Sequence, residues 1–237
     1  MGNLNNVFNP GSVALIGASD REGTVGRIIL TNLLESKDRK IFPVNPNRKT
    51  LLGRECFQNV EGIADHVDLA VIATPARQVP GLVEECGRGG IGGAVIVSAG
   101  FKEIGEEGRL LEQQVAAVRK KYGMRIVGPN CLGFMRPNAG LNVSFMKANP
   151  RPGHIAFISQ SGALGGAILD WAVDEHVGFS MFASIGSMID VDFGDLIDFL
   201  GEDEDTRSIL LYMEGVGNAR KFMSAARAFA MQKPIVV

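Results

Sequence analysis

The chain has 237 residues, of which 46% are hydrophobic and 21% are charged, and its formal net charge is -2 at pH 7. This balance is typical of a globular protein that can bury a sizeable core. It excludes a polybasic surface, so we expect neither nucleic acid nor an anionic membrane as a partner.

Cysteine usage and the N-terminus indicate the compartment. Cys56, Cys86 and Cys131 are isolated and form no CxxC or metal-ligand spacing, as expected in a reducing environment. The N-terminus lacks the regions of a signal peptide, and no apolar stretch reaches the roughly 20 residues of a membrane helix. We therefore expect a cytoplasmic protein with no membrane span.

Apolar strands alternate with amphipathic helices over the first 130 residues. The expected strands are SVALIG, KIFPVN, VDLAVIAT, GGAVIVSAG and RIVGPN, with helices over about 24–35, from about 76, and over about 106–122. Such strands predict a parallel sheet covered on both faces. The first domain is therefore expected to be a Rossmann-like, doubly wound α/β fold.

The pattern stops after Asn130 for roughly twenty residues rich in Gly, Pro and Asn, longer than most connections inside a domain. It resumes with HIAFISQSG, FSMFASIG, SILLYMEG and KPIVV, which alternate with three expected helices, through Trp171, over about 194–200 and over about 218–231. We predict two domains, residues 1–143 and 144–237. Because the last strand looks buried, it is either simply the final strand or part of a longer protein.

The candidate binding residues end the strands, because ligands of open α/β sheets bind beyond the carboxyl ends. The turn at 17–19, Gly-Ala-Ser, stands between a strand and a helix, where backbone N–H groups and the helix dipole favour an anion. Small or polar residues also end the other strands: Asn45-Pro46, Thr74-Pro75, Ser98-Ala99-Gly100 and Asn130. We expect a phosphate at the first turn.

The first turn and the second strand end argue against a simple NAD site. The glycines have the pattern GxxxxxGxxG rather than GxGxxG, and no acidic residue ends the second strand to hold a ribose hydroxyl. Arg48 and Lys49 follow that strand instead, which favours a ribose with an extra phosphate. Coenzyme A, NADP and a solvated loop remain open.

Several motifs together resemble one family. The motifs are VALIGAS, PVNPN, ATPA, IVSAGFKEIGEEG, RIVGPNCLG, IAFISQSGALG and LYMEG. Their order and spacing are similar to the α subunit, or α portion, of nucleoside-diphosphate-forming acyl-CoA synthetases, relatives of succinyl-CoA synthetase. The resemblance implies a CoA-binding Rossmann-like domain followed by a flavodoxin-like ligase domain, here incomplete at its C-terminus.

The resemblance also implies where coenzyme A binds. It assigns Gly17, Ala18 and Ser19 to the CoA phosphates, Asn45, Pro46 and Arg48 to the adenosine end, Thr74, Pro75, Ser98, Ala99, Gly100 and Phe101 to the rest of CoA, and Asn130 to the thioester. Cys131 would lie beside it, but we expect a packed thiol because the sequence supplies no base to activate it.

The second domain is expected to hold phosphate. Ser159, Ser161 and Gly162 stand between a strand and a helix and would cradle it. A serine-hydrolase elbow is disfavoured because no glycine stands two residues before Ser161. In the family a phosphohistidine passes the phosphoryl group from acyl phosphate to a nucleoside diphosphate, and Glu214 matches the glutamate that orients this histidine.

The phosphorylated histidine itself is not assigned in this chain. His66, His154 and His176 fit poorly, and we expect each to be a surface or boundary residue. The resemblance places ADP or ATP with Mg²⁺ on a β subunit or fused ATP-grasp portion. We also expect an oligomer.

No resident metal is expected. Asp190, Asp192 and Asp195 are the closest approach to an acidic cluster, and most simply they open a helix, where carboxylates favour the dipole.

Three functions remain. The first is the α portion of a synthetase that interconverts acyl-CoA, ADP and phosphate with free acid, CoA and ATP. The second is a CoA-binding or regulatory module without catalysis. The third, an NADP-dependent oxidoreductase, is disfavoured because no hydride-transfer constellation is found. The acyl group and the choice of ADP or GDP stay open.

Overall fold

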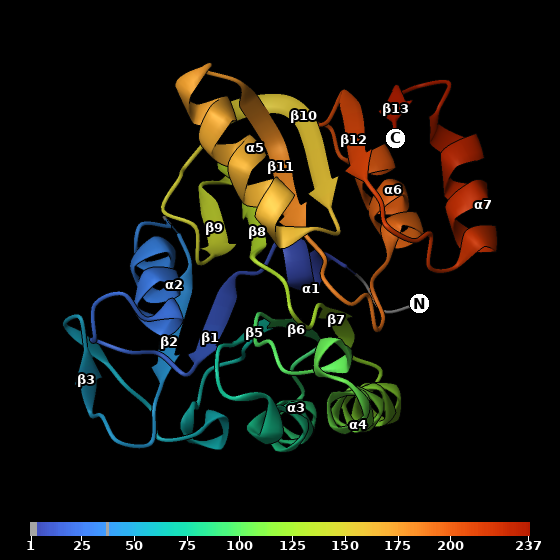
Figure 1. The fold of residues 1–237 in the computed structure, drawn as a ribbon. Coiled ribbons are helices and arrows are strands. Elements are labelled where there is room, and N and C mark those ends of the chain that lie inside the picture. The colour runs from blue at the N-terminus through green and yellow to red at the C-terminus, as the bar shows by residue number, and fades with distance from the viewer. Residues whose placement is uncertain (1–3, 37) are drawn as a thin grey trace.

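The computed structural model describes residues 4–36 and 38–237 and contains two main β-sheets with helices around and between them (Figure 1). The first sheet has the strand order β2-β1-β5-β6-β7 and is parallel throughout. Its strands are β1 (Ser12–Ile16), β2 (Lys40–Val44), β5 (Leu69–Ile72), β6 (Gly93–Ile96) and β7 (Arg125–Val127).

The second sheet has the strand order β13-β12-β10-β11-β8-β9, and its first four strands are parallel. Its strands are β8 (Gly133–Arg136), β9 (Leu141–Ser144), β10 (Arg151–Ser159), β11 (Gly178–Ser184), β12 (Ser208–Tyr212) and β13 (Ile235–Val236). The predicted fold class, a doubly wound sheet followed by a flavodoxin-like α/β unit, is confirmed.

The helices are α1 (Asn5–Phe8), α2 (Val25–Leu34), α3 (Val79–Arg88), α4 (Glu106–Tyr122), α5 (Gly162–Asp174), α6 (Phe193–Glu202) and α7 (Ala219–Phe229). The helices α2 to α7 lie close to the predicted positions, whereas α1 was not predicted. Among the residues that the structure describes, no helix combines the length and apolar character needed to cross a membrane.

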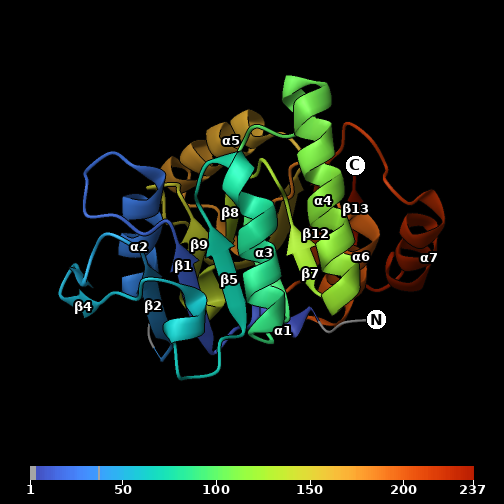
Figure 2. The same ribbon diagram turned by 90° about the horizontal axis from the view of Figure 1, so that it is seen from below.

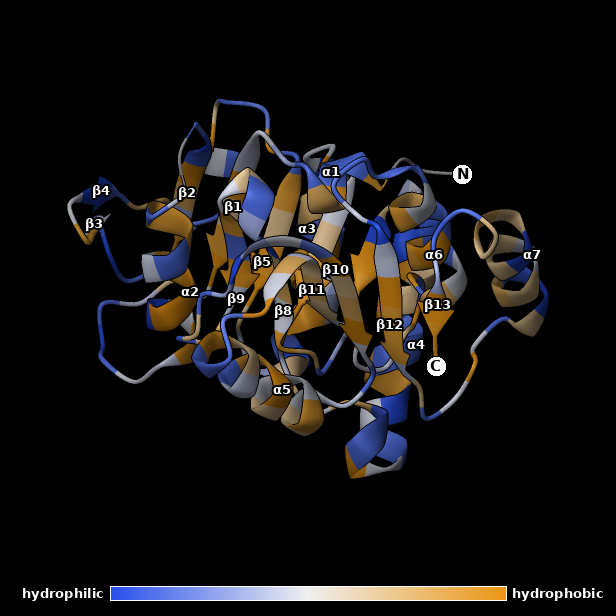
Figure 3. Ribbon diagram, turned by 90° about the horizontal axis from the view of Figure 1, so that it is seen from above, coloured by the Kyte–Doolittle hydropathy of each residue, from blue (hydrophilic) through white to orange (hydrophobic). Residues whose placement is uncertain are grey.

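Alternate side chains of the first sheet serve two different cores. On one face, Ala70, Ile72 and Ile96 pack against α3 and α4, which lie side by side in Figure 2. On the other face, Leu15 and Val71 belong to a core that also includes side chains of α2, α6 and the second sheet. The hydrophobic colour of Figure 3 accordingly gathers on the strands. The period of two along each strand thus builds two packed layers.

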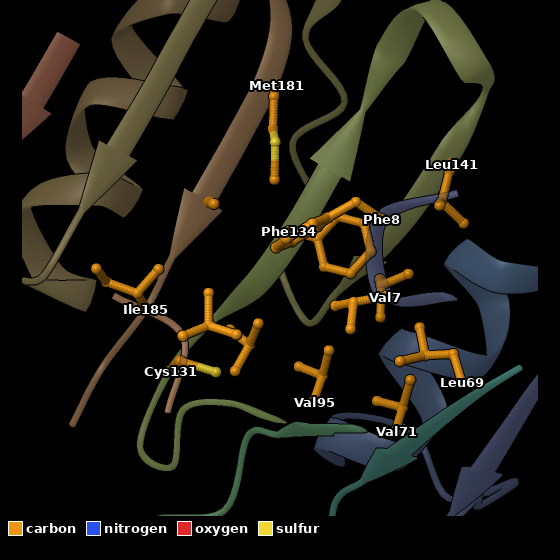
Figure 4. Close-up of a cluster of buried hydrophobic side chains, with 14 of the residues drawn as sticks. Val7, Phe8, Leu69, Val71, Val95, Cys131, Phe134, Leu141, Met181 and Ile185 are labelled. Carbon is orange, nitrogen blue, oxygen red and sulfur yellow. The ribbon is translucent and has the colours of Figure 1, made fainter. Parts of the chain in front are cut away.

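The core between the two sheets is continuous. Phe8 of α1 packs edge-on against Phe134 of β8, with ring centroids 5.0 Å apart. Val71 and Val95 of the first sheet and Met181 of the second lie around this pair in Figure 4 and are fully buried. The sheets therefore share apolar burial, the main favourable term in folding.

The segment after Asn130 was expected to be irregular, and this is wrong: it forms the hairpin β8–β9. β8 pairs antiparallel with β11, so the hairpin belongs to the second sheet. The strands were not predicted because Arg136 and Asn142 interrupt the apolar pattern. Both side chains are buried, and in the folded chain Arg136 pairs with Asp203 and Asn142 accepts a hydrogen bond from Ser144. The predicted division after residue 143 falls at the end of this hairpin and stays a prediction.

Two smaller features also differ from expectation. A short hairpin, β3 (Thr50–Leu51) and β4 (Arg54–Glu55), follows β2 and was not predicted. The last strand, β13, pairs only with β12 among the described strands and lies at the sheet edge in Figure 1. Val236 is 58% exposed, so this strand is not buried.

Backbone hydrogen bonds join the segment after β11 to the edge of the first sheet. The N–H groups of Ser187, Ile189 and Val191 donate to carbonyls at 126–129, over 2.9, 3.3 and 3.1 Å. Gly186 turns the chain at φ +55°, and a Cβ there would lie 2.2 Å from the Pro129 carbonyl oxygen. Only glycine fits this close approach.

A buried group of ion pairs lies beside these bonds. Arg125 of β7 pairs with Asp190 at 2.9 Å and with Asp195 at 3.1 Å, and all three are nearly buried. Lys221 of α7 pairs with Asp195 at 2.6 Å and Asp192 at 3.0 Å. As predicted, Asp192 caps α6, and it exchanges hydrogen bonds with Asp195 in a capping box. The cluster links β7 to α6 and α7.

Burial and pairing oppose each other in these groups. Burial acts to lower the pKa of Arg125, but Asp190 and Asp195 outweigh it and the pKa is raised. Burial acts to raise the pKa of Asp195, but hydrogen bonds from Lys221 and the Asp192 N–H, together with Arg125, outweigh it and the pKa is lowered. Both groups are therefore held in their charged forms.

We expect Arg125→Met to lower the free energy of unfolding by about 3–5 kcal/mol, because it leaves two buried carboxylates without their shared partner. Urea unfolding followed by circular dichroism measures this. Arg109→Ala is the control, since its pair with Glu106 is exposed and should change stability by less than about 0.5 kcal/mol. Equal effects of the two substitutions would contradict the role of the buried cluster.

The stabilisation from Asp195 should also depend on pH. Because its folded pKa is lowered, its contribution is present above the unfolded value of about 3.9 and is lost as the pH falls through the folded value. The stability difference between wild type and Asp195→Asn should therefore narrow as the pH is lowered from 6 to 3. A stability difference that widens on acidification would show that folding does not lower the pKa of Asp195.

Candidate functional site

The carboxyl ends of strands from both sheets open into one cleft of about 680 Å³. Seven predicted residues line it: Thr74, Ser98, Ala99 and Asn130 from the first sheet, and Ser161, Gly162 and Glu214 from the second. Residues that are far apart in sequence thus face one space, as expected at the carboxyl edge of α/β sheets.

The other predicted residues lie outside the cleft wall. They are Gly17, Ala18, Ser19, Asn45, Pro46, Arg48, Pro75, Gly100, Phe101 and Ser159. Phe101 and Ser159 are fully buried, and the Ser159 hydroxyl donates to the Ser161 carbonyl over 2.7 Å. Their assignment to ligands stays a prediction.

The first glycine turn adjoins the cleft. Gly17 has φ +92°, and a Cβ there would lie 2.6 Å from the Ala73 carbonyl oxygen. A Cβ at Gly26 would lie 2.0 Å from the Gly17 carbonyl oxygen, so α2 starts directly against the turn. The N–H groups of Gly17 and Ala18 donate to the Val44 carbonyl, over 3.1 and 3.3 Å. In this geometry the two glycines permit close packing, and those two N–H groups are already used.

The loop after β2 is held against the loop after β1. The Asn45 side chain donates to the Ala18 carbonyl over 2.8 Å, and Arg48 lies 3.4 Å from Asp20. Arg48 is 53% exposed, so its guanidinium faces solvent beside the glycine turn. The Arg48 guanidinium therefore lies past the carboxyl end of the edge strand β2, where an anionic group could reach it.

Hydrogen bonds fix the middle of the cleft. The Ser98 hydroxyl donates to the Thr74 carbonyl over 2.6 Å, and the Asn130 N–H donates to the Ser98 carbonyl over 2.9 Å. Asn130 has φ +56°, a conformation that Asn tolerates better than most residues. The ends of β5, β6 and β7 thus form one rigid wall.

The start of α5 forms the facing wall. Ser161 caps this 13-residue helix, its hydroxyl accepting from the Leu164 N–H over 3.3 Å. Gly162 and Ala163 follow it and line the cleft. The positive end of the helix dipole therefore points at the cleft, which favours an anion there.

Gln160 fixes the position of Glu214. Its side-chain oxygen accepts from the N–H groups of Glu214 and Gly215, over 2.9 and 3.0 Å. The loops after β10 and β12 are therefore tied together at the cleft, which Glu214 and the start of α5 both line.

Sequence reasoning missed several residues of the cleft. Gly186 and Ser187 follow β11, and the rule that ligands bind at strand ends would have found them had it been applied to this strand. Lys102 also lines the cleft and donates to the Ser187 carbonyl over 2.9 Å. Its neighbour Glu103 accepts from the Gly100 N–H over 2.6 Å. Lys102 gives no signal in sequence, because only folding brings it to Ser187.

Two protein families match the chain. Residues 11–137 match the CoA binding domain, and residues 152–237 match the succinyl-CoA ligase like flavodoxin domain. The chain belongs to the CoA binding domain family. The resemblance to nucleoside-diphosphate-forming acyl-CoA synthetases is confirmed. The first matched range contains the whole first sheet and also β8, whereas the second contains most of β10 and all of β11 to β13.

The relatives of this chain are longer than the chain itself. It is 46% identical to the α subunit of ADP-forming acetate–CoA ligase I of Pyrococcus furiosus, covering 99% of this chain and 52% of that protein. It is 45% identical to ADP-forming acetate–CoA ligase I of Archaeoglobus fulgidus, covering 99% and 34%. The chain thus spans about half or a third of these relatives.

A solved structure also resembles this chain. It is acetyl-coenzyme A synthetase 1 of Candidatus Korarchaeum cryptofilum in complex with phosphate and ADP. The TM-score is 0.95 and the identity is 39%, over 99% of this chain and 51% of that one. Both sheets and their connections are therefore shared.

The three histidines of the chain lie away from the cleft. His154 is near the amino end of β10, opposite Ser159, and its Nδ1 lies 2.9 Å from the Asp205 carbonyl oxygen. His66 is exposed and 3.2 Å from Asp68, and His176 is exposed just after α5. Within residues 4–36 and 38–237, no group of three or more His, Cys, Asp or Glu could hold a metal.

Cys131 is a packed thiol, as predicted. It is 3% exposed, and its Sγ donates to the Ile96 carbonyl over 3.4 Å. Burial raises its pKa to about 12. A thiol that stays protonated is a poor nucleophile.

We therefore expect Cys131 to resist iodoacetamide at pH 8 in the folded protein and to react once guanidinium unfolds it. Peptide mass spectrometry of the adducts measures this at each cysteine. Cys86, whose pKa burial also raises to about 12, is the internal control and should behave alike. Fast labelling of Cys131 in the native protein would contradict its assignment as a structural residue.

Proposed function

We propose that this chain is the α portion of a nucleoside-diphosphate-forming acyl-CoA synthetase and binds CoA and phosphate in the cleft between its sheets. One observation supports this most: the carboxyl ends of both sheets face a single cleft, with the glycine turn beside it and the start of α5 across it. CoA, with its phosphates at one end and a thiol at the other, would fit such a path, with a separate phosphate at the start of α5.

Coenzyme A would follow the strand order of the first sheet. Its adenosine end, with the 3′-phosphate, would meet Arg48 and Asn45 beyond β2. Its pyrophosphate would lie over the turn after β1, its uncharged arm along Thr74 and Ser98, and its thiol near Asn130. N–H groups later in the loop, rather than those of Gly17 and Ala18 that are bonded to the Val44 carbonyl, would serve the pyrophosphate.

The start of α5 would hold the phosphoryl group. In this reaction phosphate attacks the acyl-CoA carbonyl and CoA leaves as the thiol; the acyl phosphate then transfers its phosphoryl group to a histidine and releases the free carboxylate. Gly162 and Ser161 would stabilise the phosphate at the helix end, and Glu214, fixed by Gln160, would orient the imidazole. That histidine, the nucleotide with Mg²⁺, and the site that discharges the phosphoryl group would belong to other parts of the enzyme.

The partners and location follow from this proposal. A β subunit or fused ATP-grasp portion would complete the site, within an oligomeric enzyme. Three unpaired cysteines, all buried, suit the cytoplasm. The relatives act on different acids: one is named a 4-hydroxybutyrate–CoA ligase and another a trans-feruloyl-CoA synthase, so the acid used here is a separate question.

We expect CoA to bind the 237-residue protein, with roughly tenfold weaker binding of 3′-dephospho-CoA or after Arg48→Ala, because one charge-assisted contact is lost. Isothermal titration calorimetry at two salt concentrations measures this, and the loss should shrink at high salt. Arg88→Ala is the matched control, since Arg88 has similar exposure and also pairs with a surface carboxylate.

NADP serves as the competing ligand in the same titration. Binding of NADP with no binding of CoA would overturn the synthetase proposal in favour of an oxidoreductase. Binding of CoA that is indifferent to Arg48 and to the 3′-phosphate would overturn the assignment of the adenosine end.

A further inference from the structure

The cleft changes in polarity along the second sheet. Glu214 and Gln160 line it after β12 and β10, whereas Leu132 and Phe145 line it before β8 and after β9. The antiparallel pairing of β11 with β8 and of β8 with β9 brings these residues to the same edge as the carboxyl ends of the parallel strands. The strand order therefore separates a polar end from an apolar end.

The first sheet repeats this separation. Val25, at the start of α2 beyond β1, lines the apolar end, and Lys102 and Glu103 line the end beyond β6. Lys102 is the only Lys or Arg among the described residues of the cleft wall, and its ammonium group donates to the Ser187 carbonyl. The apolar end therefore offers no cation to a carboxylate.

The apolar end is fixed by hydrogen bonds. The Asn32 side chain donates to the carbonyls of Ser144 and Met146, over 2.8 and 2.9 Å, so both neighbours of Phe145 are tied to α2. The Phe145 N–H donates to the Leu132 carbonyl over 3.3 Å. A wall held in this way discriminates by shape, because it cannot relax around a larger group.

This wall begins at the proposed phosphate site. The Leu132 side chain lies 3.5 Å from the position that a Cβ on Gly162 would take, and it also approaches Gly166. A carbonyl that reacts beside the start of α5 would therefore direct its substituent at Leu132.

We propose that Leu132 and Phe145, together with Val25, form the acyl subsite and restrict the acyl group to a short, uncharged chain. This inference rests on the proposed function, because it takes acyl-CoA as the ligand. It names the class of acid: small monocarboxylates are accepted, and longer or dicarboxylic acids are rejected.

Calorimetric titration of the 237-residue protein with CoA, acetyl-CoA, hexanoyl-CoA and succinyl-CoA tests the proposal. We expect acetyl-CoA to bind about as tightly as CoA, and the hexanoyl and succinyl esters to bind at least about tenfold more weakly. Leu132→Ala and Phe145→Ala should remove most of the hexanoyl penalty, leave the succinyl penalty, and change CoA binding by less than about twofold.

Leu110→Ala, at a half-exposed leucine of α4 outside the cleft wall, is the matched control and should change none of these values. Thermal melting checks folding, and Leu132→Val provides a milder step with an intermediate effect. If Leu132→Ala and Phe145→Ala weaken the binding of CoA and of its esters equally, these side chains contact the arm of CoA rather than the acyl group, and the proposal is overturned. It is also overturned if hexanoyl-CoA still binds as weakly to both variants, relative to CoA, as it does to the wild type. No CoA binding by the wild type would overturn the proposed function itself, and this inference with it.

Discussion

The ion pairs of Arg125 with Asp190 and Asp195 decide how the two sheets face each other. Arg125 is the first residue of the edge strand β7, while Asp190 belongs to the connection from β11 to α6 and Asp195 lies in the first turn of α6. Backbone hydrogen bonds from Ser187 and Val191 run alongside and hold this connection to the sheet edge. Buried charges tolerate little displacement, because each one loses its compensation when its partner moves. The cluster therefore fixes the relative position of the two sheets. Apolar packing alone would not do so, since hydrophobic contact is not directional.

This relative position of the two sheets creates the cleft. Parallel strands bring small and polar residues to one edge of each sheet, but each edge alone is only a row of loops. When the edges meet, Asn130 faces the residues that open α5, and Glu214 is held near them by Gln160. The glycines at 17, 26 and 186 permit the close approaches that this requires, because a Cβ at each would overlap a backbone oxygen. Sites that join two groups in one reaction need this kind of fixed opposition.

The period of the apolar residues was enough to predict the parallel strands, the long helices and the strand ends that line the cleft. It failed where a fold uses polar groups inside. The hairpin β8–β9 contains buried Arg136 and Asn142, and Arg136 is acceptable there because the distant Asp203 pairs with it, while Asn142 accepts from the nearby Ser144. The same reason kept Lys102 out of the predicted site, since its position depends on a carbonyl 85 residues away. Local patterns predict elements well and long-range polar pairs poorly.

The turn at Gly17 illustrates how a correct location can be reached through an incomplete mechanism. A glycine turn between strand and helix predicts an anion held by N–H groups, yet the first two N–H groups are used by Val44 to join β1 to β2. What glycine supplies here is proximity: it lets α2 and the end of β5 approach the turn. An anion at this turn would then depend on groups further along the loop and on the neighbouring Arg48. Affinity in this part of the chain should therefore reside more in side-chain charge than in the glycine backbone, and so be more sensitive to salt than a site made of N–H groups alone.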